Sequence, residues 1–136
     1  MTFTARLQFG NNDLQLYNSE FLLVNCHVHT SRQYNAFFPT TSPRVEWIEV
    51  SIVADHGGNL RLQEWYVSQN VETGRILFEM TDVATLEDVT RQILFEDAVC
   101  YSMEEKYDIN EIRRRQITLR IVAQNITIDD VTFKQY

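Results

Sequence analysis

Apolar and polar residues alternate along much of the chain, which is the period-two pattern of a β-strand with one buried and one solvated face. Residues 3–9 show it first, with Phe, Ala, Leu and Phe separated by Thr, Arg and Gln. Four turn-forming residues at 10–13 then predict a hairpin that closes on a short second strand over residues 14–17. A separate long strand is expected over residues 20–34, which are rich in β-branched, aromatic and aliphatic side chains.

The same alternation returns in the rest of the chain. In residues 45–53 it places Glu46 on the same face as Ile48, Val50 and Ile52. Further strands are expected over residues 75–80, 91–106, 115–124 and 131–133.

One segment, residues 60–69, changes to the helical period. Leu62, Trp65 and Tyr66 fall on one side of a helix, and Asn59 can cap its first turn. About ten residues are too few for a helix that is stable alone in water, so this face must dock on the sheet. We therefore expect Leu62, Trp65 and Tyr66 to anchor the helix on the core.

These elements predict a mainly β fold. We expect a compact antiparallel β-barrel, or a tightly packed β-sandwich, of seven or eight strands with one short flanking α-helix near residues 60–69. The length of 136 residues is typical of one domain, so residues 1–136 are taken as a single domain.

Composition narrows the class of protein. Apolar residues make up 44% of the chain, which is too many for a disordered segment, yet no stretch is long enough to span a membrane. The first residues do not form a basic start followed by an apolar run, so we expect a cytoplasmic protein without a signal peptide. A net charge of −7 argues against binding to nucleic acid.

Candidate chemistry is sparse. His27 and His29 would share one face of a strand and could begin a metal site with His56, but they can equally be two polar side chains on a sheet surface. Cys26 and Cys100 are expected to be free thiols. Pairs of carboxylates are frequent, as chance predicts for an acidic chain: Asp82, Glu87–Asp88, Glu96–Asp97, Glu104–Glu105 and Asp129–Asp130.

The nucleophile elbow, the phosphate-binding loop and the dinucleotide fingerprint are all absent from the sequence. We therefore predict no catalytic residue, no cofactor and no metal. The more informative feature is the loop at residues 35–43, in which Phe37, Phe38 and Pro39 follow one another. Adjacent phenylalanines in a surface loop either fold back onto the core or meet a partner.

The order of four stretches carries a family resemblance: residues 60–65, Gly-Arg-Ile-Leu-Phe at 74–78, Phe-Glu-Asp-Ala at 95–98 and the alternation at 117–123. They follow a long strand, a loop with proline and an alternating strand, and in this order the features span nearly the whole chain. The chain resembles the haemolysin-coregulated protein (Hcp, TssD) family, and especially its Bacteroidetes branch. These proteins are tube subunits of type VI secretion systems.

The resemblance implies a compact β-barrel with a flanking helix, of which six copies form a ring. Rings stack into a hollow tube, and a contractile sheath drives that tube out of the cell. Members have no catalytic residues, so the implied partners are other copies of the chain and the sheath, baseplate or effector proteins. The protein would be cytoplasmic when assembled and secreted on firing. In this family the extended loop touches the next ring, which implies an inter-ring role for Phe37, Phe38 and Pro39.

Alternatives remain at this point. A specialised paralogue that caps or decorates the tube has the same sequence features. A phage-type tail tube or tail-completion subunit obeys the same physics of ring closure. A monomeric β-barrel that binds a small apolar ligand would line its interior with aromatic residues.

Overall fold

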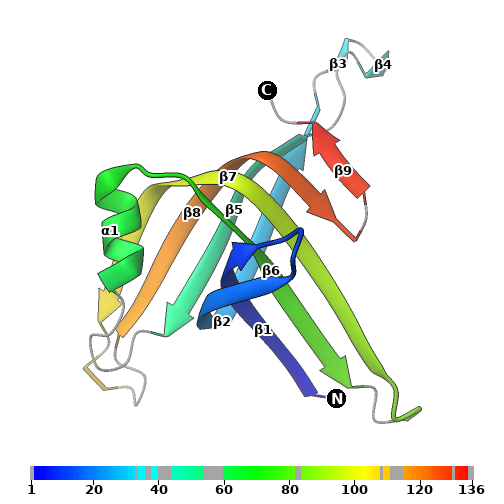
Figure 1. Cartoon of the computed structure of the whole chain (residues 1–136), viewed down its shortest axis with the longest axis horizontal. Helices are drawn as coiled ribbons and strands as arrows, with labels where there is room; N and C mark the ends of the chain where they lie inside the picture. The colour runs from blue at the N-terminus through cyan, green and yellow to red at the C-terminus, as the bar shows by residue number, and fades with distance from the viewer. Residues whose placement is uncertain are drawn as a thin grey trace.

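The structure is a computed structural model of the chain, shown in Figure 1. It describes residues 2–32, 34–35, 38–39, 44–53, 60–81, 84–107, 109–110, 115–129 and 131–134. Within these ranges, no helix has the length and apolar character needed to cross a membrane.

Six antiparallel strands form a closed sheet, in the order β5-β2-β1-β6-β7-β8, and pairing of β5 with β8 closes the ring. Their bounds are β1 Thr2–Asn11, β2 Leu16–Ser31, β5 Arg44–Val53, β6 Glu72–Thr81, β7 Asp88–Tyr107 and β8 Arg115–Ile128. The predicted mainly β barrel with one short helix is confirmed. A closed sheet has few free edges that could pair with the wrong chain.

Three shorter strands complete the described structure. Strand β9 (Val131–Lys134) pairs with the last four residues of β8. Strands β3 (Tyr34–Asn35) and β4 (Phe38–Pro39) pair only with each other, and Figure 1 shows them beyond the barrel end at which β2 finishes.

Two sequence predictions about strands were wrong. Residues 14–17 and 20–34 were expected as separate strands, but one strand, β2, runs from Leu16 to Ser31. Asn18 and Ser19 lie between the two predicted strands, and both side chains accept hydrogen bonds from Arg61. Polar residues can therefore continue a strand where a side chain from another element, here Arg61 of the helix, bonds to them.

The second wrong prediction concerns Glu46. The pairing of β2 with β5 shifts between His29 and Thr30, which leaves Glu46 as an extra residue on β5. Such a bulge changes the alternation, so Val45 is buried together with Ile48 while Glu46 is not. Alternation alone cannot place a residue that lies in a bulge.

The inner faces of the strands meet in one core. Its largest side chains with almost no exposed surface include Phe9, Phe95, Leu7, Ile48, Ile76 and Ile121. Burying each such side chain contributes roughly 1.5–3 kcal/mol, which makes this core the main source of stability.

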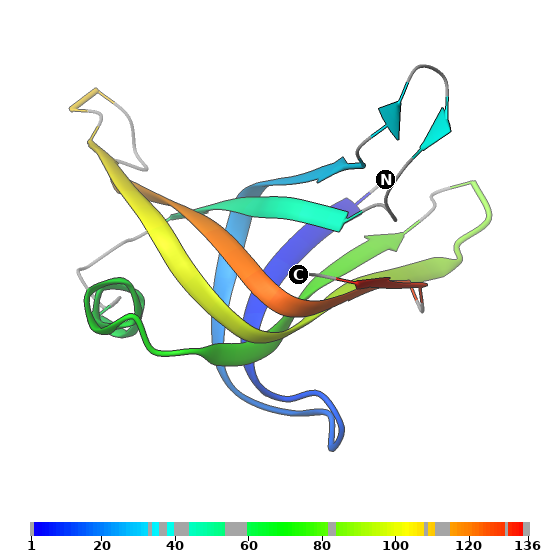
Figure 2. The same cartoon turned by 90° about the horizontal axis from the view of Figure 1, so that it is seen from above.

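Helix α1 (Leu60–Ser68) lies beside β7, as Figures 1 and 2 both show. Strand β6 begins at Glu72, which pairs with Ala98 of β7. The helix packs against β7 at the same place, since Trp65 donates to the carbonyl of Ala98. Gln69 ends the helix with a left-handed backbone, φ 58°, and its amide still donates to the carbonyl of Trp65.

Candidate functional site

The interior of the barrel is filled by side chains and offers little room for a ligand. Phe9, Phe95, Leu7 and Ile121 all have no exposed surface. A hollow of about 570 Å³ is lined partly by charged residues such as Arg44 and therefore lies at the surface. This arrangement does not support the small-ligand barrel as a function.

The helix is held by two of its three predicted anchors. Leu62 and Trp65 are buried, and the Trp65 indole Nε1 donates a 3.3 Å hydrogen bond to the carbonyl of Ala98. The Trp65 ring also meets Phe9 edge-on at 5.2 Å. Tyr66 differs from the expectation, with 39% of its surface exposed. It follows Trp65 by one residue and so points about 100° further round the helix axis.

His27 and His29 both contact Trp47 on the outside of the barrel. Their rings lie 5.1 Å from the indole, His29 stacked on it and His27 edge-on. The guanidinium of Arg120 lies 4.8 Å from the same indole and donates to Glu49. No group of three or more potential metal ligands occurs among the described residues, and the third histidine considered above, His56, lies outside them.

Several carboxylates are engaged by arginines. Glu105 accepts hydrogen bonds from Arg115 at 2.8 Å, Tyr107 at 2.7 Å and Gln63 at 3.1 Å. The bond from Arg115 is the largest cause that lowers the pKa of Glu105 to about 2. The hydrogen bond from Arg91 likewise lowers the pKa of Asp129. These groups stay ionised and tie elements together, which is a structural task.

The two cysteines are free thiols. Burial raises the pKa of both Cys26 and Cys100 to about 11. Since the thiolate is the nucleophilic form, neither sulfur is activated near neutral pH.

The loop phenylalanines are only partly covered by the structure. Phe38 and Pro39 form β4, with Asn35 opposite Phe38 and Tyr34 opposite Pro39. Phe37 lies outside the described residues. Whether these residues contact another ring therefore stays a prediction.

The turn predicted at residues 10–13 lies at residues 12–15, which we call the β1–β2 turn, and its bonds to the sheet were not predicted. Asn12 Nδ2 donates to the carbonyls of Gly74 at 2.9 Å and Phe95 at 3.2 Å, and Asn12 Oδ1 accepts from the Tyr17 hydroxyl at 2.7 Å. These bonds fold the turn back onto the sheet. A Cβ at Gly74 would clash with the backbone of Gln8, so glycine is required under this turn.

The same turn exposes leucines. Leu14, inside it, and Leu16, just after it, are each 66% exposed. The side chain of Asn11 fixes the backbone here, because its Oδ1 accepts from the amides of Asp13 and Leu14. The run Asn-Asn-Asp marks a turn in the sequence, but it does not reveal exposed apolar groups on a rigid backbone.

A second missed feature is an apolar hollow of about 280 Å³ at the other end of β1, which we call the Phe3 groove. Phe3 stacks on Phe78 with ring centroids 6.0 Å apart, and 58% of Phe3 is exposed. The groove is lined by Phe3, Phe78, Met80, Ile93 and Ile128, with the ion pair of Arg91 and Asp129 at its side.

A filled β-barrel with exposed apolar surfaces suits a class of protein, the structural subunit that works by assembly. The chain matches, over residues 1–136, the family model described as "TssD: Hemolysin coregulated protein Hcp (TssD)", and it belongs to this family. It is a type VI secretion tube protein, a non-enzymatic structural protein that forms hexameric rings stacking into tubes.

Solved structures share the fold. The chain is similar to Hcp1 from Flavobacterium johnsoniae, with 17% identity, a TM-score of 0.71, and coverage of 97% of this chain and 99% of that chain. For the secreted protein Hcp3 from Pseudomonas aeruginosa, identity is 9%, the TM-score 0.63 and coverage 94% and 92%.

A chain of the anti-feeding prophage baseplate is 11% identical with a TM-score of 0.52, over 93% of this chain and 91% of that chain. No curated protein matches the sequence.

Proposed function

We propose that this chain is the main building block of a type VI secretion tube of the Bacteroidetes branch, with all 136 residues acting as one tube-subunit domain. The observation that carries the proposal is the β3–β4 hairpin, which among the described residues pairs with no strand of the barrel and extends past its end (Figures 1 and 2). A projecting arm suits a subunit that must hold the next ring, whereas a capping paralogue needs such a contact on one side only.

In this proposal, Phe37, Phe38 and Pro39 contact the adjacent ring. The hairpin holds Phe38 and Pro39 in a defined backbone, and the neighbouring Phe37 adds a second large apolar group. Burying two phenylalanines at each of six equivalent contacts would give the tube a strong stacking interaction.

The test is the double variant Phe37→Ser, Phe38→Ser. We expect rings of normal mass by native mass spectrometry but no tubes in negative-stain images. The control is Leu86→Ser, which alters an exposed leucine in the β6–β7 connection and should leave both rings and tubes intact. Loss of the folded domain in the double variant would show instead that the phenylalanines belong to the core.

We also propose that the sheath, the baseplate and carried effectors are its partners, and that the protein is cytoplasmic until firing. Mass spectrometry of culture supernatant tests this, and the protein should appear there only when a contractile sheath is present. Release that is independent of the sheath would contradict the proposal.

A further inference from the structure

We propose that the β1–β2 turn of one copy of this chain inserts into the Phe3 groove of the next copy, and that this contact joins neighbours within a ring. The inference rests on the ring-forming function above and adds the two surfaces that carry it out.

A ring needs two different surfaces on each subunit. Copies arranged head to tail around a closed ring meet through a heterologous contact, in which one patch of a subunit binds another patch of its neighbour. The described part of the chain offers a matched pair, since Leu14 in the β1–β2 turn and the adjacent Leu16 are exposed and the Phe3 groove is an apolar hollow.

The turn is suited to insertion because its shape is fixed before binding. Asn12 ties it to the carbonyls of Gly74 and Phe95, and Asn11 fixes the amides of Asp13 and Leu14. A surface held in its bound conformation loses little conformational entropy when it associates. An exposed leucine on a rigid backbone, as Leu14 is, therefore has the properties of an interface anchor.

The groove exists because β2 leaves β1. Strands β1 and β2 pair from Asn11 back to Ala5, where Leu23 turns to pair with Ile52 of β5. Phe3, two residues before Ala5, faces the same side as the core, but β2 no longer runs beside it. A hollow of about 280 Å³ is below the usual 300–1,000 Å³ range for small-molecule pockets and better suits a few side chains.

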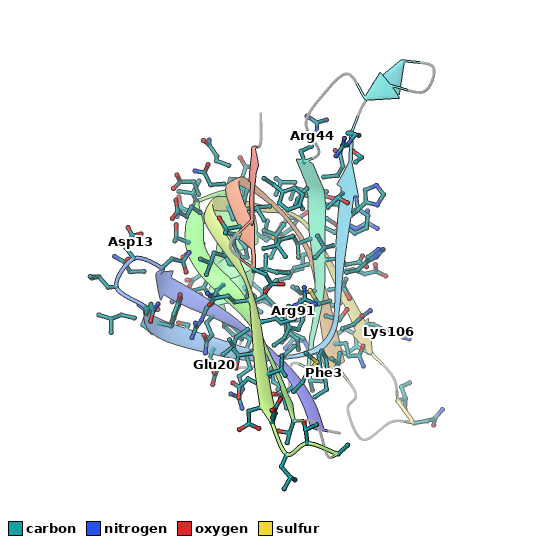
Figure 3. The ribbon with its side chains drawn as sticks, turned by 90° about the vertical axis from the view of Figure 1, so that its right-hand side faces the viewer. Phe3, Asp13, Glu20, Arg44, Arg91 and Lys106 are labelled. Carbon is teal, nitrogen blue, oxygen red and sulfur yellow. The ribbon has the colours of Figure 1, made fainter. Side chains whose placement is uncertain are left out.

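The described turn of one subunit cannot reach its own groove. The two surfaces lie at opposite ends of β1, and the eight residue steps from Phe3 to Asn11 span about 26 Å. Figure 2 shows the turn and the amino-terminal end of β1 far apart, and Figure 3 shows Asp13 and Phe3 well separated. A turn that enters the groove must therefore belong to another copy of the chain.

Each surface carries a charged group beside its apolar part. Asp13 lies next to Leu14 in the turn, and its side chain is exposed. Arg91 and Asp129 both line the groove, where Nε and Nη2 of the exposed guanidinium bind the carboxylate. A guanidinium has five N–H donors, so insertion of the turn would bring the Asp13 carboxylate toward donors of Arg91 beyond those that bind Asp129, which favours a second copy of the chain as the occupant.

The test uses two variants that each lack one surface. Leu14→Asp with Leu16→Asp removes the apolar turn, and Phe3→Asp removes the groove. Each variant alone should run at the mass of one 16.0 kDa chain instead of a ring. When they are mixed, the intact turn of one can still enter the intact groove of the other, so a dimer and no ring is expected. Leu86→Asp is the control and should form rings.

A cross-linking measurement covers the possibility that an aspartate variant does not fold. The double variant Phe3→Cys, Leu14→Cys should give a ladder of up to six linked chains with a short bifunctional maleimide. The unaltered chain, in which Cys100 is buried and Cys26 is half-buried, should give no such ladder. Rings that persist in the turn variant, or rings of the cysteine variant that give no ladder, would overturn the contact and leave the tube function standing. An unaltered chain that never forms rings would contradict both.

Discussion

Phe3 and Phe9 lie on the same strand, on the same face and six residues apart, yet Phe9 has no exposed surface and Phe3 is 58% exposed. Around Phe9, the rings of Phe21, Phe95 and Trp65 close the barrel. Around Phe3, only Phe78 stacks among the described aromatic contacts. We call these two regions the closed end and the open end of β1.

The unequal exposure of the two ends shows how one strand can serve both folding and assembly. The closed end is covered by a helix that belongs to the same chain, so its apolar side chains contribute to the stability of the monomer. The open end leaves an equally apolar side chain exposed to water, and contact with another molecule would bury it. Substitutions at the closed end should therefore affect unfolding, and those at the open end should affect assembly.

The largest expected effect separates the two ends directly. Phe9→Ala should lower the free energy of unfolding by about 3–5 kcal/mol, because it leaves a cavity among packed rings. Phe3→Ala should cost only about 0.5–1.5 kcal/mol, the worth of one aromatic pair. Urea titration of both variants as monomers measures the two values. Equal losses would show that the open end is as much a part of the core as the closed end.

Loss of the Asn12 side chain should have a smaller effect. Asn12→Ala leaves two carbonyls and the Tyr17 hydroxyl without their partner at a part-buried site, which should cost about 1–2 kcal/mol. Hydrogen exchange of residues 12–16 should also speed up. Asn11→Ala, which removes bonds in an exposed position, is the matched comparison and should cost less. An unchanged exchange rate in Asn12→Ala would show that the turn is held by other contacts.

Glu105 predicts how the contact between α1, β7 and β8 responds to acid. Its pKa is about 2 in the folded chain, below the ordinary 4.5, so its bonds to Arg115, Tyr107 and Gln63 stabilise the folded state fully above about pH 4.5. This contribution is lost as the pH falls from 4.5 toward 2. The midpoint temperature of thermal unfolding should be lower for Glu105→Gln than for the unaltered chain near neutral pH, and the two temperatures should approach each other at pH 2. A gap that does not change with pH would contradict the assignment.

The smallest effect concerns salt. Each chain carries a net charge of −7, and a ring multiplies it, so moderate salt should stabilise rings by screening repulsion. The ring fraction measured by light scattering should rise between low and moderate ionic strength. A steady fall over that range would mean that attraction between charges dominates the contact.

The sequence predicts the shared face of Phe3 and Phe9 and the position of the helix, but it does not predict that Phe3 is exposed. Alternation places Phe3 and Phe9 on one face, and the helical period places α1 within one residue of its observed end. The exposure of Phe3 depends on the point at which β2 stops pairing with β1 and begins to pair with β5. The pairing of β2 with β5 joins parts of the chain that are distant in sequence, so local patterns do not predict it. Asn12 likewise bonds to carbonyls 62 and 83 residues away.

Local irregularities were hidden for a related reason. The bulge at Glu46 and the left-handed backbone of Asp97, φ 52°, change which face a side chain occupies, and neither residue is a glycine that would mark the site. The sequence did identify the family, because the order of several stretches persists even where each is weak. The inter-ring role of Phe37, Phe38 and Pro39 stays a prediction.

The most direct test of the central account is the mass of the purified, unaltered chain in solution. Native mass spectrometry at moderate salt should show closed rings with six times the mass of the 16.0 kDa chain, and the Phe3→Asp variant should run as a single folded chain under the same conditions. An unaltered chain that remains monomeric at high concentration, particularly with a bound apolar ligand, would contradict the account.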